Sequence, residues 1–160
     1  MTQFHKSGVT VSLLSRLEKT LPQTVKRENH DDMTTVLSHI RRDLETLLNT
    51  KRSDIPISHK RPWVNQSIIQ FGMPDFMNLN FAQEQGQFQL CQLIKQTIEL
   101  FEPRIHDVMV FIESETVIHS TLSVTIQGNI KHNNQHHECL FESLLDPDQQ
   151  YFSLNSGKAL

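Results

Sequence analysis

Four carboxylates in the middle of the sequence could take part in acid–base chemistry: Glu84, Glu99, Glu102 and Asp107. Hydrolysis of a glycan needs two carboxyl groups whose surroundings push their pKa values apart and which face each other across a cleft. Each of the four lies in an ordinary charged setting, and Glu99 and Glu102 are spaced as neighbours on one face of a helix. The sequence also lacks a G-x-S-x-G motif and a phosphate-binding glycine loop. It specifies no catalytic pair, and we expect no enzymatic activity.

The segment K-H-N-N-Q-H-H-E-C at residues 131–139 combines side chains that bind soft divalent metals. His132, His136, His137 and Cys139 are its potential ligands. No second set of ligands accompanies them, and such a cluster on a polar hairpin turn is usually solvated. We therefore expect no metal and no cofactor, with a metal at residues 132–137 as the alternative.

The segment F-E-P-R at residues 101–104 has the most informative local chemistry. Pro103 has no amide donor and disfavours helical geometry at Glu102, so a helix must end there. Glu102 then lies at the negative end of the helix dipole, where an anion is disfavoured by up to about 1 kcal/mol, which suggests a cationic partner. Arg104 is the nearest candidate, but both side chains could equally bind a second protein. A third interpretation is an exposed pair of little energetic value.

A helix over residues 34–48 is predicted upstream of this segment. Its apolar residues fall on one stripe and its charged residues fill the rest of the surface; the stripe consists of Leu37, Ile40, Leu44, Leu47 and Leu48. Asp31 or Asp32 suits its start and Asn49 its end. Lys51 and Arg52 follow, where cations meet the negative end of the helix dipole, so a structural role explains them without a ligand.

A second helix is predicted over residues 87–101, with an apolar stripe so broad that it needs burial on two sides. A short amphipathic helix is predicted before Pro22, because Leu13 or Leu14, Leu17 and Leu21 repeat at helical spacing. The segment between the two long helices contains several prolines and glycines and is expected to be ordered but irregular.

Strands follow Pro103. The continuous apolar run Val108–Ile112 is typical of a central strand buried on both faces. Residues 118–126 alternate between apolar and polar, which predicts a strand with one wet face before a turn at Gly128 and Asn129. Another strand is expected from Cys139, and a last edge strand at Tyr151–Leu154 precedes a frayed tail.

The order of these elements predicts an α+β fold: two main helices followed by and packed on a mainly antiparallel β-sheet, plus a short N-terminal helix. The expected organisation is an extension at residues 1–30, one domain at 31–154 and a tail at 155–160. The net charge of −3 and pI near 6.3 argue against nucleic acid as a partner. The sequence has no apolar run of membrane-spanning length and no signal-peptide pattern, so we expect a cytoplasmic protein with two reduced cysteines and no membrane insertion.

Three segments resemble motifs of the TssE family of type VI secretion baseplate subunits, which are similar to the small wedge protein of contractile-tail phages. Residues 42–52, R-D-L-E-T-L-L-N-T-K-R, resemble the family's R-D-L-E-x-L-L-N-T-R-R. Residues 71–75, F-G-M-P-D, resemble Y-G-L-P-D, and residues 101–105, F-E-P-R-I, resemble F-E-P-R-L. Residues 12–17, S-L-L-S-R-L, resemble the opening S-L-L-x-R-L. Lys51 replaces the usual Arg, which loses planar bidentate bonding there.

The resemblance implies a baseplate wedge domain at residues 31–154 that binds the wedge proteins TssF, TssG and TssK. It also implies contact with the sheath proteins TssB and TssC and nucleation of the sheath by strand sharing, at the cytoplasmic side of the inner membrane. The resemblance places Glu102, Pro103 and Arg104 at the wedge contact. It adds Arg42, Asp43, Asn49, Lys51 and Arg52 as motif residues of uncertain role.

Two other functions remain as alternatives. The family carries a "lysozyme-like" label, which would mean a peptidoglycan hydrolase. A regulatory anti-adaptor that inhibits delivery of a sigma factor for proteolysis is similar in fold, although the N-T-K-R and E-P-R segments argue against it. For strand sharing, the last strand is expected to offer an open backbone edge unless the N-terminal helix or the final loop from Asp146 covers that edge.

Overall fold

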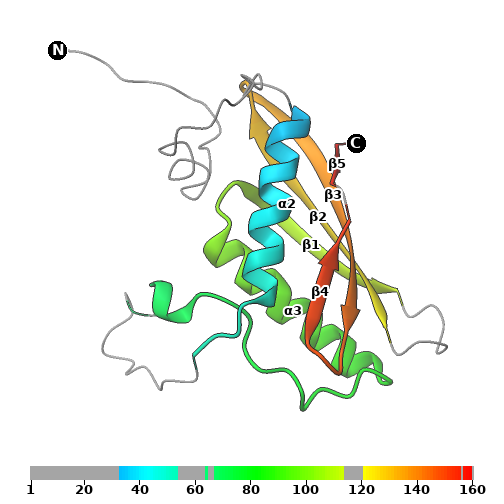
Figure 1. Cartoon of the computed structure of the whole chain (residues 1–160). Helices are drawn as coiled ribbons and strands as arrows, with labels where there is room; N and C mark the ends of the chain where they lie inside the picture. Colours follow the sequence, from blue (N-terminus) through cyan, green and yellow to red (C-terminus); the bar gives the residue numbers. More distant parts are fainter. Residues whose placement is uncertain (1–32, 54–63, 65–66, 114–120, 156, 160) are drawn as a thin grey trace, which may run out of the picture.

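Two α-helices pack on one face of an antiparallel sheet in the computed structural model of the chain (Figure 1). The structure describes residues 33–53, 64, 67–113, 121–155 and 157–159. The expected N-terminal helix, the proposed capping residues Asp31 and Asp32, and residues 118–120 of the alternating segment lie outside these ranges. Within them, the predicted α+β fold is confirmed.

The first helix, α2, spans Met33–Asn49, close to its predicted limits, and buries the predicted apolar stripe. The second, α3, spans Glu84–Phe101 and begins three residues earlier than predicted, after an extended Gln83. Leu90, Ile94 and Ile98 are fully buried on its inner face. The prediction that this helix is buried on two sides is wrong, because Leu100 is 43% exposed.

The sheet has the strand order β1-β2-β3-β4, and every pairing is antiparallel. Its four main strands are β1 (Ile105–Glu113), β2 (Leu122–His132), β3 (Gln135–Asp146) and β4 (Tyr151–Leu154). A two-residue strand, β5 (Lys158–Ala159), pairs with β3 beside β4, in the segment that we expected to be a frayed tail. The inward side chains of β2 and β3 alternate with outward ones and pack on the helices.

Two strand predictions are wrong. The apolar run Val108–Ile112 is part of the edge strand β1, where Met109 and Phe111 are each 48% exposed. The helices cover only one face of the sheet, so half of this apolar run faces solvent. Strand β2 does not end at Gly128 but continues to His132. Gly128 is required there because a Cβ would lie 2.4 Å from Ile105 Cγ2 on β1.

The turn between β2 and β3 is formed by Asn133 and Asn134 instead. Both residues have positive φ, 47° and 64°, as a two-residue type I′ hairpin requires. Asparagine tolerates this left-handed region better than most residues. The tight turn therefore sets the register of β2 and β3 over their full paired length, from His132 with Gln135 to Leu122 with Leu145.

Candidate functional site

The three sequence motifs meet in one region of the fold, between α2 and the C-terminal end of α3. We call this region the motif junction and define it by residues 41–52, 71–75 and 101–105. The rings of Phe71 and Phe101 stack edge to face with centroids 5.4 Å apart, which joins the second motif to the third. The contacts described below join the first motif to both.

A three-residue ion cluster forms the centre of the junction. Arg104 Nε donates to Glu102 Oε1 at 2.6 Å and its Nη2 donates to Oε2 at 2.5 Å, a bidentate pair. The same Nη2 donates to Asp43 Oδ2 on α2 at 2.5 Å. The side chains of Glu102, Arg104 and Asp43 are only 6%, 13% and 18% exposed. The cluster therefore ties the end of α3 and the start of β1 to the middle of α2.

The burial of this cluster determines its energetics. Burial alone would lower the pKa of Arg104, but hydrogen bonds and charges from Glu102 and Asp43 outweigh it and raise that pKa. The guanidinium therefore stays charged. Its positive charge compensates the negative charges of two carboxylates that burial has largely removed from water. Pro103, between the two paired residues, is exposed. The cluster thus fixes the position of a surface residue in addition to joining the helices.

The first motif joins the second by backbone pairing. Met73 N–H donates to the Thr50 carbonyl and Arg52 N–H donates to the Met73 carbonyl, both at 2.8 Å, in a short parallel bridge. Gly72 has φ +107°, and a Cβ on it would lie 2.2 Å from the Thr50 carbonyl oxygen. Only glycine fits this position. The F-G-M-P-D loop is consequently held against the end of α2, with Met73 buried in the core.

Lys51 and Asp75 strengthen the same connection at the surface. Lys51 Nζ lies 2.8 Å from Asp75 Oδ2, and Asp75 Oδ1 accepts hydrogen bonds from Met77 N–H at 3.0 Å and from Gln150 Nε2 at 3.0 Å. The hydrogen bond from Lys51, followed by those from Met77 and Gln150, lowers the pKa of Asp75 well below its ordinary value. Lys51 thus makes a single charged hydrogen bond with Asp75, where an arginine could make two parallel ones.

Asp75→Asn is expected to destabilise the protein more near neutral pH than in acid. The folded-state pKa of Asp75 is below the ordinary 3.8, so its ionised form contributes stability above that pH, and the contribution is lost as the pH falls through the lowered pKa. Urea unfolding of both proteins at about pH 6 and about pH 3 measures this, and the difference in unfolding free energy should shrink at the lower pH. An equal difference at both pH values would contradict a stabilising role for the charge.

The first motif also reaches the last main strand through Asn49 and Arg41. Phe152 N–H donates to Asn49 Oδ1 at 2.7 Å, and Asn49 Nδ2 donates to the Phe152 carbonyl at 2.8 Å. Arg41 Nη1 donates to the Leu154 carbonyl at 2.5 Å. These side chains bind the outward backbone groups of β4 as a neighbouring strand would. We call this pair of α2 side chains the β4 clamp. It overturns the expectation that the last strand offers an open edge.

The predicted site residues thus divide into four groups. Asp43, Glu102 and Arg104 form the ion cluster, Asn49 forms part of the β4 clamp, and Lys51 and Arg52 bind the F-G-M-P-D loop. Arg42 and Pro103 are exposed at the surface of the junction. Sequence reasoning about single residues missed Asp75, Gly72 and Phe152. The first two belong to a motif that the sequence did single out, but Phe152 had no recognisable signal.

The histidine-rich segment forms no ligand set in the described part of the chain. His132 and Cys139 lie on the helix-covered face of the sheet, whereas His136 is exposed on the other side. Cys139 Sγ donates to the Gly128 carbonyl at 3.2 Å, and burial raises the pKa of the thiol to about 11. The metal-binding thiolate is therefore scarce at neutral pH. Among the described residues, no three metal-binding side chains gather around one point.

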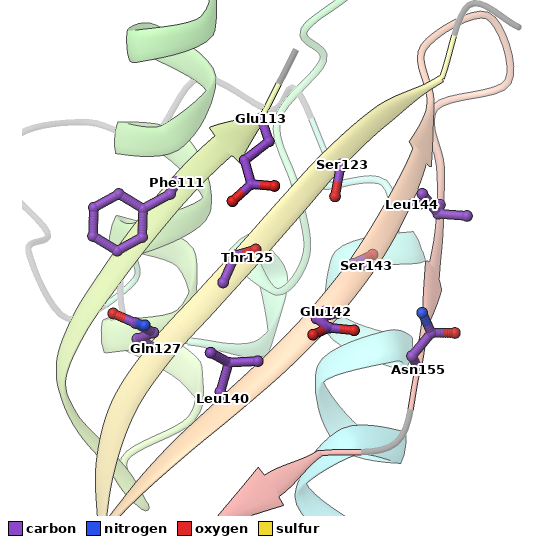
Figure 2. A pocket seen from close by; sticks show the side chains of 10 residues that line it. All are labelled: Phe111, Glu113, Ser123, Thr125, Gln127, Leu140, Glu142, Ser143, Leu144 and Asn155. Atoms are coloured by element: carbon purple, nitrogen blue, oxygen red, sulfur yellow. The ribbon is translucent and has the colours of Figure 1, made fainter. Parts of the chain in front are cut away.

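The predicted carboxylates do not assemble either. Glu99 pairs with Lys95 at 3.8 Å, Asp107 accepts a hydrogen bond from Asn129 at 3.1 Å, and Glu102 belongs to the ion cluster. A hollow of about 480 Å³ does lie on the outer face of the sheet (Figure 2). Its carboxylates, Glu113 and Glu142, are exposed and come from strands separated by β2. Neither has the apolar setting of a catalytic acid.

The described residues therefore form a small α+β domain in which a network of contacts joins the two helices, the F-G-M-P-D loop and β4. None of the described helices is long and apolar enough to cross a membrane. A family model for baseplate wedge protein gp25 matches residues 34–135, which include the whole motif junction, and the chain belongs to this family. A comparison with curated protein sequences gives no match.

Proposed function

We propose that this chain is the TssE-type wedge subunit of a type VI secretion baseplate, which links wedge proteins to the contractile sheath and nucleates sheath assembly. One observation carries the proposal: the three motifs that resemble this type of subunit pack together at one junction, inside the region that matches the wedge family. The wedge partners in this proposal are TssF, TssG and TssK, and the sheath partners are TssB and TssC.

The geometry supports a division of roles within F-E-P-R. Glu102 and Arg104 bond to each other and to Asp43, so their charged groups are already engaged inside the subunit. Pro103 and Arg42 are exposed beside them. In this proposal the wedge proteins contact the surface formed by Pro103 and Arg42, and Glu102 and Arg104 hold that surface in place. A rigid, preorganised contact surface reduces the entropy lost on binding.

The proposal assigns no catalytic role. The wedge family is a structural one, and the carboxylates of the described residues are either ion-paired, hydrogen-bonded or exposed. In this proposal the subunit acts in the cytoplasm, where the baseplate assembles at the cytoplasmic side of the inner membrane.

Affinity purification tests the proposal. The chain, tagged at its C-terminus and in a parallel strain at its N-terminus, is recovered gently from its own bacterium while the secretion genes are expressed. Mass spectrometry should identify wedge and sheath proteins with at least one of the two tags. Recovery of neither class with either tag, from cells that contain those proteins, would contradict the proposal.

The same purification tests the exposed contact. Pro103→Glu places a charge on the proposed contact surface and is expected to reduce recovered wedge proteins by about tenfold, with unfolding free energy changed by less than about 1 kcal/mol. Gln135→Glu adds the same charge to the exposed start of β3 and should leave recovery unchanged. Equal recovery of wedge proteins with both variants would show that Pro103 is not part of the wedge contact.

A further inference from the structure

The short 3₁₀ helix η2 (Ile68–Gln70) carries apolar side chains that the core does not use. Ile68 is 87% exposed and Ile69 is 47% exposed, and none of the three residues of η2 is buried. The turn nevertheless has a fixed shape, because Phe71 N–H donates to the Ile68 carbonyl at 3.1 Å. Isoleucine is usually buried, since its contact with water is unfavourable. An ordered turn that holds isoleucines in solvent is therefore suited to contact with another molecule.

This turn adjoins the motif junction. Phe71 directly follows η2, and its ring packs on Phe101 at the end of α3. Exposed apolar residues flank Phe101 as well, since Leu100 is 43% exposed and Pro103 is exposed. We call the exposed apolar residues around the contact of the two rings the apolar patch: Ile68, Ile69, Leu100 and Pro103. Because Pro103 belongs to the proposed wedge contact, the patch extends that contact toward η2.

The charges of the motif junction favour an acidic partner. The junction contains five cationic side chains and four carboxylates, although the whole chain has a net charge of −3. All four carboxylates are ion-paired with cations of the junction: Asp43, Glu45, Asp75 and Glu102. Arg52 is half-buried, and its backbone N–H donates to the Met73 carbonyl. Among the described residues, no hydrogen bond or ion pair engages the Arg52 guanidinium. This cation can therefore bind a carboxylate of another molecule.

We propose that a wedge protein covers the apolar patch with apolar side chains and places a carboxylate on Arg52. The inference rests on the proposed function, to which it adds the chemistry of the bound segment. Contact with Ile68 and Ile69 removes apolar surface from water, and the Arg52 guanidinium can make two parallel hydrogen bonds to a carboxylate. A basic segment would bring like charges together at this junction. The bound segment of the wedge protein is therefore both apolar and acidic.

Purification of the tagged full chain from its own bacterium tests the apolar part of the inference. Ile68→Asp places a carboxylate within the patch and should reduce recovered wedge proteins by about tenfold. Phe88→Asp is the matched control, because Phe88 is 63% exposed near the other end of α3, and it should leave recovery unchanged. Circular dichroism and thermal unfolding establish that both variants fold.

The outcomes separate the inference from the proposed function. If the wild-type chain recovers wedge proteins and Ile68→Asp recovers as much, the patch is not part of the contact, while the proposed function stands. If the wild-type chain recovers no wedge protein, the proposed function fails, and the inference fails with it.

Charge reversal tests the acidic part. Arg52→Glu should reduce recovered wedge proteins by about tenfold, whereas Arg52→Lys should keep part of the recovery, because it retains the charge without the paired hydrogen bonds. Lys158→Glu is the matched control, since it makes the same charge change at a side chain of β5 that is 64% exposed. Added salt should weaken recovery by the wild type more than recovery by Arg52→Gln. Equal recovery with Arg52→Glu and Lys158→Glu would overturn the acidic partner.

A second copy of this chain is the other occupant that the experiments must distinguish. Size-exclusion chromatography of the isolated chain should give a monomer, because the proposed occupant is a different protein. A dimer that Ile68→Asp dissociates would show that the apolar patch joins two copies, and it would overturn the proposed partner.

Discussion

Arg104→Ala is expected to lower the free energy of unfolding by about 3 kcal/mol. The substitution leaves the Glu102 and Asp43 carboxylates without the guanidinium that compensates them, although their side chains are only 6% and 18% exposed. A buried charge without a partner costs more than the pair itself contributes, because the desolvation of each carboxylate is no longer offset. This expected loss is at the lower end of the range for breaking a buried ion pair, since part of the cluster remains in contact with water.

Urea unfolding of the wild type and the variant measures this loss. Lys95→Ala is the matched control, because it removes a cation from the exposed pair with Glu99 and should cost less than about 0.5 kcal/mol. Arg104→Lys should recover only part of the loss, since an ammonium cannot make the bidentate contact with Glu102. An Arg104→Ala protein as stable as the Lys95→Ala protein would show that the cluster does not hold the fold together.

Asn49→Ala is expected to cost about 2 kcal/mol, the second largest effect. Alanine at position 49 leaves both the N–H and the carbonyl of Phe152 without their side-chain partner. Phe152 is 0% exposed, so water does not readily replace that partner. The β4 edge should open at the same time, so the amide of Phe152 should exchange faster than in the wild type. Unfolding free energy and hydrogen exchange are both measured on this variant.

Thr46→Ala is the matched control for the clamp. Thr46 lies on the exposed face of the same helix, where its hydroxyl only donates back to the Arg42 carbonyl, so its loss should change stability by less than about 0.5 kcal/mol. If Asn49→Ala unfolds at the wild-type urea concentration and the Phe152 amide stays protected, the clamp does not close the β4 edge.

The helices were predictable from sequence because their signal is local. The spacing of Leu37, Ile40, Leu44 and Leu48 identifies both the helix and its buried face. The broad stripe of α3 misled the prediction, because Leu100 is apolar but exposed. Sequence shows which residues are apolar, but it does not show which of them the fold covers.

The same limit explains the error at β1. A continuous apolar strand is typical of a position between two neighbours, and V-M-V-F-I fits that pattern, yet β1 is an edge strand. Gly128 was misassigned for a different reason: it permits close packing against Ile105 and is not part of a turn.

The candidate site was predictable in its residues but not in its pairings. The motifs pointed to Glu102, Arg104 and Asp43, but Asp43 and Arg104 are 61 residues apart, and no local rule joins them. Likewise Asn49 was suited to a helix end, and its position there is confirmed, but its bonds to Phe152 depend on where β4 lies. Long-range contacts of this kind follow from the packing of helices on the sheet.

Imaging the sheath in living cells tests the central claim most directly. The gene for this chain is deleted from its bacterium, which also carries a fluorescently labelled sheath protein, and the wild-type gene is then restored. A subunit that connects wedge and sheath is required for assembly, so extended sheaths should be absent after deletion and return on complementation. Sheaths of normal number and length in the deleted strain would contradict a structural role in the baseplate.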